Sequence, residues 1–326
     1  MKKNFLLTVL TLPLLVTSCQ HKKDNKITIA EVTRSIFYAP MYVALSEDYF
    51  QDEGLDVDII TTPGADKTMA ALLSREAQVG LMGPEASIYV YNNGQQDYAI
   101  NFAQLTQKDG SFLISREKYD NFSFDNLKGK TIIGGRKGGM PEMVLEYVLK
   151  TKGYSISQDS KDKDICVRTD IQFDVMAGAF SSGNGDFVTL FEPSATQMEM
   201  INEGYIVASI GEHCGNIPYT CFSSLKSYQK EHSANLKAFC KAIKKGEEYV
   251  HTHSETEIAQ KIANYFPSTS KEVVSNVVKR YASIDAWSHN LKLEADGFEK
   301  LQDIMEMAGE LSNRVSYDTL VTNDYL

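Results

Sequence analysis

Hydrophobic and polar positions in the first part of the chain switch from strand spacing to helical spacing and back again. The pattern predicts a strand, a loop, a helix and a second strand over residues 27–32, 35–38, 41–50 and 55–59. Pro40 suits the start of the helix, because its missing N–H is no loss there. A loop between a strand end and a helix start is where open α/β sheets bind ligands.

Short strands and helices continue to alternate along most of the chain. Further strands are predicted over 99–104, 111–115, 132–133 and 187–190, and a further helix over 141–150. From Ser233 onward nearly every segment has the pattern of an amphipathic helix. Strands that alternate with helices predict α/β layers and mostly parallel sheets.

The N-terminus has the pattern of an export signal. Lys2 and Lys3 precede an apolar run over 5–16 that is too short to span a bilayer comfortably. Small residues then precede Cys19, as in a bacterial lipobox. We therefore expect residues 1–18 to be a lipoprotein signal peptide, Cys19 to be lipidated, and residues 19–26 to be a tether. An ordinary secretory signal is the alternative, and both take the chain out of the cytoplasm.

The charge balance argues against a nucleic-acid partner. The chain has 33 basic and 43 acidic side chains and a net charge of −10, whereas neutralising phosphates needs clustered Lys and Arg. Its length permits a large core in one or two lobes. Beyond the signal, no apolar run is long enough to predict a transmembrane helix.

Four cysteines follow the predicted lipidation site, at Cys166, Cys214, Cys221 and Cys240. Export permits disulfides, and Cys214 with Cys221 is the easiest pair to form. A chain of this length does not need one, so buried free thiols are an equal alternative. No CxxC motif is present, and neither a redox motif nor a zinc ribbon is indicated.

The motifs that mark enzymes and cofactor sites are incomplete in this chain. The run 129–131 is only the end of a phosphate loop, because Phe124 occupies the position of the required first glycine. No GxSxG elbow is present. His251 and His253 are two residues apart in a helical run, where such side chains face apart. We therefore expect no catalytic residue, no metal and no cofactor.

Three segments of the chain resemble one known family. They are APMYVALSEDYFQDEGLDVDI at 39–59, AALLSREAQVGLMG at 70–83 and GELSNRVSYDTLVTNDYL at 309–326. In this order they resemble the solute-binding proteins of ABC importers. The most similar branch includes the nitrate, sulfonate and thiamine-pyrimidine binders.

The resemblance implies an α/β, two-lobe periplasmic-binding-protein fold of type II, with a ligand cleft between the lobes. Lobe one would hold residues 27–112 and 220–326, and lobe two residues 113–219. The two crossings, near 111–115 and 217–222, would form a hinge that closes the lobes around a ligand.

Candidate ligand residues of lobe one lie in loops that follow predicted strands. These residues are Phe37, Tyr38, Gly64, Ala65, Glu85, Gln104 and Thr106. Each has a structural alternative: the two aromatic rings could pack as core, and Glu85 could serve the dipole of the helix that it begins. Asp66, beside the second loop, is expected to cap the following helix rather than to bind ligand.

Lobe two contributes a glycine loop, a carboxylate and a residue near the hinge. The candidates are Lys137, Gly138, Gly139, Met140, Glu192 and Tyr219. Glycines allow close backbone approach, and a helix start attracts negative charge. A solvated turn with two exposed cations, Arg136 and Lys137, is the alternative for this loop. Glu192 sits where the resemblance implies that the cleft closes.

These features favour a lipid-anchored, extracytoplasmic receptor, at the periplasm or the cell surface. It would act as a monomer, capture a small molecule and deliver it to an ABC permease and its ATPase, with the lipid on Cys19 holding it at the membrane. An enzyme on the same fold, such as a pyrimidine-precursor synthase, and a ligand-sensing lipoprotein are the alternatives. A ring-bearing vitamin or pyrimidine-type precursor fits the carboxylates and aromatics, whereas a sulfonate-like anion fits the glycine loop alone.

Overall fold

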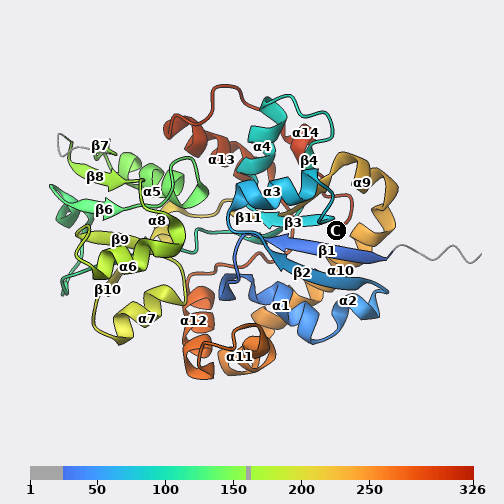
Figure 1. Ribbon diagram of the computed structural model, residues 1–326, viewed down its shortest axis with the longest axis horizontal. Helices are drawn as coiled ribbons and strands as arrows, with labels where there is room; N and C mark the ends of the chain where they lie inside the picture. The colour runs from blue at the N-terminus through green and yellow to red at the C-terminus, as the bar shows by residue number, and fades with distance from the viewer. Residues whose placement is uncertain (1–24, 159–162) are drawn as a thin grey trace, which may run out of the picture.

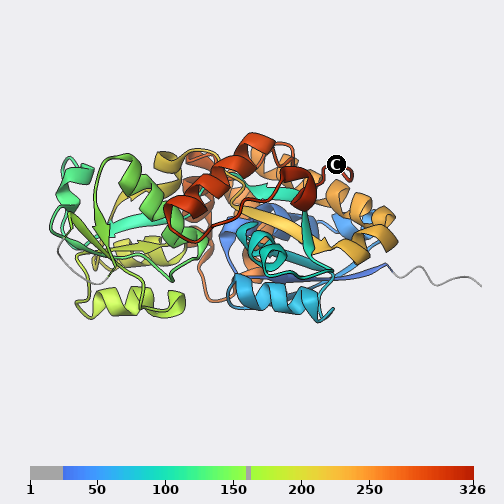
Figure 2. The same cartoon turned by 90° about the horizontal axis from the view of Figure 1, so that it is seen from above.

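Two β-sheets lie side by side along the long axis of the molecule, each covered by helices (Figures 1 and 2). A computed structural model describes residues 25–158 and 163–326. The predicted signal peptide, Cys19 and most of the tether lie outside the described residues. In the part of the chain that is described, no helix is both long and apolar enough to cross a membrane.

The first sheet has the strand order β2-β1-β3-β11-β4. Its strands are β1 (Lys26–Glu31), β2 (Asp56–Thr61), β3 (Val79–Met82), β4 (Ala99–Thr106) and β11 (Thr220–Leu225). Strand β1 is parallel to β2 and β3, and β11 is antiparallel to β3 and β4. All residues of β3 and β11 are buried, as expected for strands with helices on both faces.

The second sheet has the strand order β10-β5-β9-β6-β8-β7. Its strands are β5 (Phe112–Ser115), β6 (Thr131–Ile133), β7 (Ile156–Ser157), β8 (Ile165–Arg168), β9 (Phe187–Leu190) and β10 (Tyr205–Ser209). Strand β6 is parallel to β8 and β9, and β7 is parallel to β8. Strand β5 pairs antiparallel with β9 and β10. The prediction of α/β sheets is therefore confirmed, but parallel pairing is limited to β2-β1-β3 and β9-β6-β8-β7, and β4, β5, β10 and β11 pair antiparallel.

Helices lie on both sides of the first sheet, and we call this sheet with its helices the first lobe (Figure 1). On one side are α3 (Ala65–Leu73) and α4 (Glu85–Asn92), and on the other are α1 (Ala39–Ser46), α2 (Tyr49–Asp52) and α10 (Ser233–Thr252). The others are η1 (Ile36–Tyr38), α9 (Lys226–Glu231), α11 (Glu255–Ile262), η4 (Ala263–Tyr265), α12 (Lys271–Ser283), α13 (Ala295–Met307) and α14 (Tyr317–Leu320).

Helices of the second lobe are shorter. They are η2 (Phe124–Leu127), α5 (Met140–Thr151), η3 (Phe173–Val175), α6 (Met176–Ser181), α7 (Ser194–Met200) and α8 (Ile210–Cys214). Helix α5 packs against α8, α6 against β9, and α7 against β10. We use the names first lobe and second lobe for the two sheets with these helices; the lobe boundaries expected from the sequence stay a prediction.

The chain crosses between the sheets from β4 to β5 and from α8 to β11. Two C-terminal helices also bridge the lobes: α12 contacts η1 and α7, and α13 contacts α4 and α5. Figure 2 shows α13 lying across the junction. Lys150 on α5 donates to the Met307 carbonyl at the end of α13 (Nζ to O, 2.8 Å). The two sheets are therefore joined by packed helices as well as by the crossings.

The prediction of one unbroken helix over residues 41–50 is wrong. Helix α1 ends at Ser46, α2 begins at Tyr49, and Asp48 between them has a left-handed φ of 56°. Asp tolerates this conformation better than most residues, so the chain turns here although the hydrophobic spacing continues.

The cysteines were expected either to form a disulfide or to be buried free thiols. The structure has free thiols: the four cysteines that follow Cys19 are unpaired and buried.

Gly246 lets α10 pack directly on α1, the helix that follows the loop at 35–38. A Cβ at Gly246 would lie 2.1 Å from the Pro40 carbonyl oxygen of α1. Glycine costs about 1 kcal/mol relative to alanine inside a helix, so this position is explained by the close approach and not by helix propensity. The contact fixes α1, and hence the end of the loop before it.

We predict that Gly246→Ala lowers the free energy of unfolding by about 1–3 kcal/mol, because the added methyl group has no space against the α1 backbone. Chemical denaturation monitored by circular dichroism measures it. Gly178→Ala in α6 is the matched control, because a Cβ there meets nothing within 4 Å, and it should be neutral or stabilising. A Gly246→Ala protein as stable as the control variant would contradict the packing argument.

Candidate functional site

A cleft of about 800 Å³ lies between the two lobes. Its lining comes from the segments that follow β1, β2, β3, β6 and β8, together with the end of β9 and the start of β11. The carboxyl ends of parallel strands meet at one edge of a sheet, and this edge is the usual ligand site of open α/β sheets. The cleft is therefore placed where the strand–loop–helix pattern of the sequence predicts a ligand.

Most of the residues expected to bind ligand line this cleft. They are Phe37, Tyr38, Gly64, Ala65, Glu85, Gly138, Gly139, Met140 and Tyr219. The first five come from the first lobe, the next three from the end of the glycine loop and the first residue of α5, and Tyr219 from the second crossing. The structure thus brings together side chains and backbone from distant parts of the sequence, and their contact with a ligand stays a prediction.

Gln104, Thr106 and Lys137 lie outside the lining. Thr106 Oγ1 donates to Thr220 Oγ1 at 2.8 Å. The side-chain nitrogen Nε2 of Gln104 donates to the Thr106 carbonyl oxygen at 3.3 Å. Both residues are buried, and Thr220, the partner of Thr106, does line the cleft. Lys137 is exposed and pairs with Glu310 at 3.8 Å. The strand and loop positions were predicted, but the side chains face other partners.

Glu192 is also outside the lining, and both of its carboxylate oxygens are engaged. The Thr196 backbone N–H donates to Oε2 at 2.8 Å, and the Thr196 hydroxyl donates to Oε1 at 2.8 Å. Arg280 on α12 donates to the same Oε1 at 2.9 Å. In this structure Glu192 therefore holds the start of α7 and ties it to α12, rather than facing the cleft.

Asp66 does not cap α3, contrary to the prediction. Gly64 is the residue before the helix, with a φ of 101°, and Asp66 lies in the first turn. The Asp66 carboxylate instead faces Arg136 of the second lobe, with 3.3 Å between Oδ1 and Nη1. Both side chains are about half exposed, so the pair contributes about 0–1 kcal/mol. It nevertheless spans the mouth of the cleft.

Aromatic rings from both lobes form much of the wall. The ring of Phe191 lies 6.0 Å from Phe37, 6.3 Å from Tyr219 and 5.6 Å from Phe173, measured between centroids. Tyr89 on α4 donates from its hydroxyl to the Gly138 carbonyl across the cleft at 3.1 Å. Sequence reasoning did not place Phe173 or Tyr89 in the site, because neither follows a predicted strand directly.

Glu85 is the buried acid of the cleft. The residue is 4% exposed, and its Oε2 has no hydrogen-bond partner among the described residues. Burial raises the pKa of Glu85 to about 8, against the smaller opposing effects of a backbone hydrogen bond and of Arg136. A Cβ at residue 83 would lie 2.0 Å from this Oε2, so only Gly83 leaves space for the carboxyl group.

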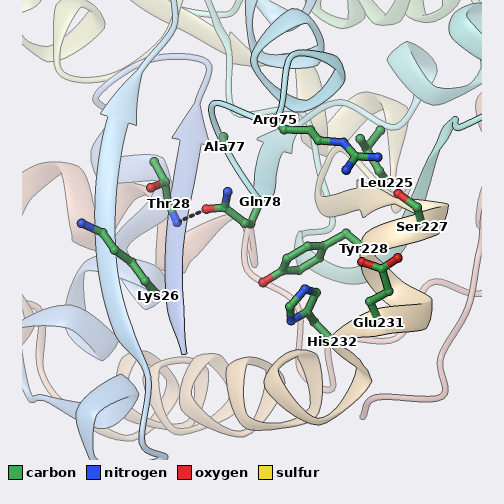
Figure 3. Close-up of a pocket in the computed structure, with 10 residues that line it drawn as sticks. All are labelled: Lys26, Thr28, Arg75, Ala77, Gln78, Leu225, Ser227, Tyr228, Glu231 and His232. Atoms are coloured by element: carbon green, nitrogen blue, oxygen red, sulfur yellow. Dashed lines mark hydrogen bonds between the residues drawn. The ribbon is translucent and has the colours of Figure 1, made fainter. Parts of the chain in front are cut away.

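A second, smaller hollow of about 360 Å³ lies at the opposite end of the first sheet (Figure 3). It is lined by Lys26, Thr28, Arg75, Ala77, Gln78, Leu225, Ser227, Tyr228, Glu231 and His232. The Gln78 side chain already has a hydrogen-bond partner within the protein, because its oxygen accepts from the Thr28 backbone N–H at 2.8 Å. The hollow lies at the amino ends of β1 and β3, away from the ligand edge of the sheet.

Among the described residues, no group of three or more His, Cys, Asp or Glu side chains is arranged to hold a metal ion.

We predict that Glu85→Gln makes stability less dependent on pH. The pKa of Glu85 rises from an ordinary value of 4.5 to about 8 on folding, so the folded state binds this proton more tightly. Its contribution to stability is complete below about pH 4.5 and is lost as the pH rises toward 8. Removing the group should flatten the slope in this window by up to about 1.4 kcal/mol per pH unit.

Denaturant unfolding of the unliganded protein at several pH values measures this slope. Glu76→Gln is the control, because Glu76 is an exposed glutamate outside the cleft. A Glu85→Gln slope equal to that of the parent and the control would show that Glu85 ionises normally in the folded protein.

Known proteins share the sequence and the fold of this chain. A family model described as "NMT1/THI5 like" matches residues 36–257. A Bacillus subtilis (strain 168) protein named "Putative binding protein YtlA" is 44% identical over 310 residues, which cover 95% of this chain and 91% of that protein.

Two solved structures share the fold at low sequence identity. The alkanesulfonate-binding protein SsuA from Xanthomonas axonopodis pv. citri, bound to MOPS, has a TM-score of 0.71 at 15% identity, covering 91% of this chain and 98% of that one. The periplasmic aliphatic sulphonate binding protein SsuA from Escherichia coli has a TM-score of 0.71 at 13% identity, covering 91% and 97%. The chain therefore has the α/β periplasmic-binding-protein fold, and it belongs to the NMT1/THI5-like family.

Proposed function

We propose that this protein is the extracytoplasmic solute-binding component of an ABC import system and that it captures a small ring-bearing molecule between its lobes. The observation that carries the proposal is the cleft of about 800 Å³ with aromatic walls from both lobes. This volume falls within the roughly 300–1,000 Å³ of small-molecule sites. The name of the Bacillus relative, a binding protein, supports binding rather than catalysis.

Ring-on-ring contact would supply much of the affinity. Phe173 and Phe191 of the second lobe line the cleft opposite Phe37 and Tyr38 of the first. A planar ligand laid against this wall would bury apolar surface, and offset or edge-on ring pairs add about 0.5–1.5 kcal/mol each beyond this burial. Such a ligand touches both lobes and so favours their approach.

Closure would follow from contacts that need both lobes. The hydrogen bond from Tyr89 to the Gly138 carbonyl and the ion pair of Asp66 with Arg136 each span the cleft. A ligand that binds the closed arrangement better than the open one shifts the population toward it by its differential affinity. The permease and its ATPase would then accept the closed protein. One chain supplies both walls, so a monomer suffices.

The sequence before the described residues would place this receptor at a membrane. The pattern of residues 1–18 followed by Cys19 fits a lipoprotein signal, and the tether at 19–26 would then join the lipid to the first strand. The protein would act outside the cytoplasm, at the periplasm or the cell surface. We propose transport rather than sensing, since one solved protein that shares the fold, from Staphylococcus aureus, is named as the ligand binding component of an ABC-type import system.

A solute screen tests the ligand proposal. Thermal shift of residues 25–326 with vitamin precursors, nucleobases, sulfonates, nitrate and amino acids should give a specific hit, since ligand at 100 times its dissociation constant adds about 2.7 kcal/mol of stability. Phe173→Ala should weaken a ring-bearing hit by about 0.5–1.5 kcal/mol in calorimetric titration.

Val175→Ala is the matched control. Val175 is two residues from Phe173, similarly exposed (52% against 46%) and outside the lining of the cleft, so its affinity should equal that of the parent. Equal affinities in all three proteins would contradict ring contact with Phe173, and the absence of any hit would contradict solute binding within the screened classes.

We predict that Cys19→Ser moves the full-length protein from the membrane fraction to the soluble fraction, because the side chain that carries the lipid is lost. Fractionation after metabolic labelling with a fatty acid measures both the lipid and the location. Cys240→Ser is the control, since Cys240 is buried in α10 and should leave labelling unchanged. A labelled Cys19→Ser protein in the membrane fraction would contradict the lipobox interpretation.

A further inference from the structure

Positive charge gathers on one part of a chain that is acidic as a whole. The stretch 226–245, KSYQKEHSANLKAFCKAIKK, forms α9 and the first part of α10. It holds six of the chain's 33 basic side chains but only one of its 43 acidic ones. The net charge of −10 therefore conceals a local excess of lysine.

Helical spacing turns these lysines toward solvent. Lys237, Lys241 and Lys244 are four and three residues apart, so they lie on one side of α10, and all three are exposed. Leu236 and Phe239 of the same helix are fully buried in the core. Two further lysines are exposed on α9. We call the exposed side chains of Lys226, Lys230, Lys237, Lys241 and Lys244 the basic face.

Neither the stability of α10 nor ion pairing accounts for the basic face. The first turn of a helix favours acidic side chains, but α10 has none there and has Glu247 and Glu248 in its second half. Lys226 donates to the Tyr98 hydroxyl at 3.3 Å. The side chains of the other four lysines have no hydrogen-bond or ion-pair partner among the described residues. Besides Glu248, the exposed acid on these two helices is Glu231.

The basic face lies beside the start of β1, where the predicted tether joins the protein. Lys26 of β1 and Tyr228 of α9 line the same hollow, together with His232 between α9 and α10 (Figure 3). Figures 1 and 2 show α9 and the first part of α10 at the end of the first lobe that is away from the second lobe. The six residues 19–24 span at most about 20–22 Å. A lipid on Cys19 would therefore keep this end of the first lobe near the membrane surface.

We propose that the basic face is a docking surface for the anionic phospholipid headgroups of the membrane that holds the lipid anchor. The lysine ammonium groups donate to the phosphate oxygens of the headgroups, so the first lobe lies against the bilayer beside the tether. The inference adds a second membrane contact to the anchored receptor proposed above and rests on that anchor. It leaves the cleft free, because the cleft lies at the carboxyl ends of the parallel strands and the basic face lies beside their amino ends.

Screening makes the local charge more important than the net charge. At about 0.1 M salt the Debye length is about 10 Å, so acids elsewhere on the molecule are largely hidden from a bilayer that touches the basic face. Each lysine close to an anionic bilayer strengthens binding by about fivefold. The same screening keeps the contact reversible. The contact therefore orients a receptor that the lipid holds and does not replace the anchor, in agreement with the soluble Cys19→Ser protein predicted above.

Vesicle binding of the unlipidated protein tests the contact by itself. The two probes are vesicles of phosphatidylglycerol and phosphatidylcholine in equal parts and vesicles of phosphatidylcholine alone. At low salt the mature chain, residues 19–326 with Cys19→Ser, should bind the first at least about tenfold more tightly in a sedimentation assay. The difference should shrink as salt is added. Equal binding to both kinds of vesicle, or binding to neither, would overturn the proposal.

Two fourfold variants of this chain test where the charge acts. Both change four exposed lysines to glutamine, so both alter the net charge equally. The first variant removes lysines of the basic face and should bind the phosphatidylglycerol vesicles at least about tenfold more weakly. The second changes lysines outside α9 and α10 and should bind like the chain with Cys19→Ser alone. Thermal unfolding by circular dichroism should be nearly unchanged in both, since the substitutions are exposed. The first variant is Lys230→Gln, Lys237→Gln, Lys241→Gln and Lys244→Gln, and the second is Lys67→Gln, Lys118→Gln, Lys271→Gln and Lys279→Gln.

The outcomes separate this inference from the proposed function. An equal loss of vesicle binding in both variants shows that only the net charge matters and overturns the basic face. Binding of soluble polyphosphate through the same four lysines, without vesicle binding, overturns the membrane as the partner. Either result leaves solute binding and the lipid on Cys19 intact, because the thermal-shift screen and the fatty-acid labelling test those separately.

Discussion

The packing of one ring, that of Phe37, joins the parts on which the site depends. Phe37 is 1% exposed, and its ring lies 6.0 Å from Phe191 of the second lobe and 4.9 Å from Tyr281 of α12. Its carbonyl accepts the Trp287 indole N–H at 2.9 Å. A Cβ at Gly110, in the first crossing, would lie 2.8 Å from the same ring. The first ligand loop, the crossing and the second lobe thus meet at one residue.

This packing limits how the lobes can move. Tyr281 donates to the Gly110 carbonyl at 3.3 Å and accepts the Glu192 backbone N–H at 3.2 Å, so α12 holds both the crossing and the second lobe. Arg280 adds the ion pair to the Glu192 carboxylate. Opening of the cleft would then turn about this packed region, while the mouth, where Asp66 faces Arg136, moves most. The mouth is held by one half-exposed ion pair of small energy, Asp66 with Arg136, which suits the reversible closure that we propose.

Sequence pattern predicted β1, β2, β4, β5, β6 and β9 and the edge of the sheet at which the cleft lies, because alternation and helix starts are local signals. It placed Glu85 and the glycine loop in the cleft for the same reason. It did not predict β7, β8, β10 or β11. It did not find that Glu192 turns to Thr196 and Arg280, since Arg280 is far away in the chain. Phe173 likewise reaches the wall only through the folding of the second sheet. Side-chain partners between lobes depend on tertiary packing, which has no local pattern.

The central claim is that a solute binds between the lobes at Glu85 and the aromatic wall. A crystal structure of residues 25–326 with the most stabilising solute of the screen tests it most directly. The account predicts electron density for a planar ligand in the cleft, beside Glu85 and with a ring against Phe191 or Phe173. Ligand density elsewhere, for example in the hollow beside His232 (Figure 3), with an empty cleft would contradict it.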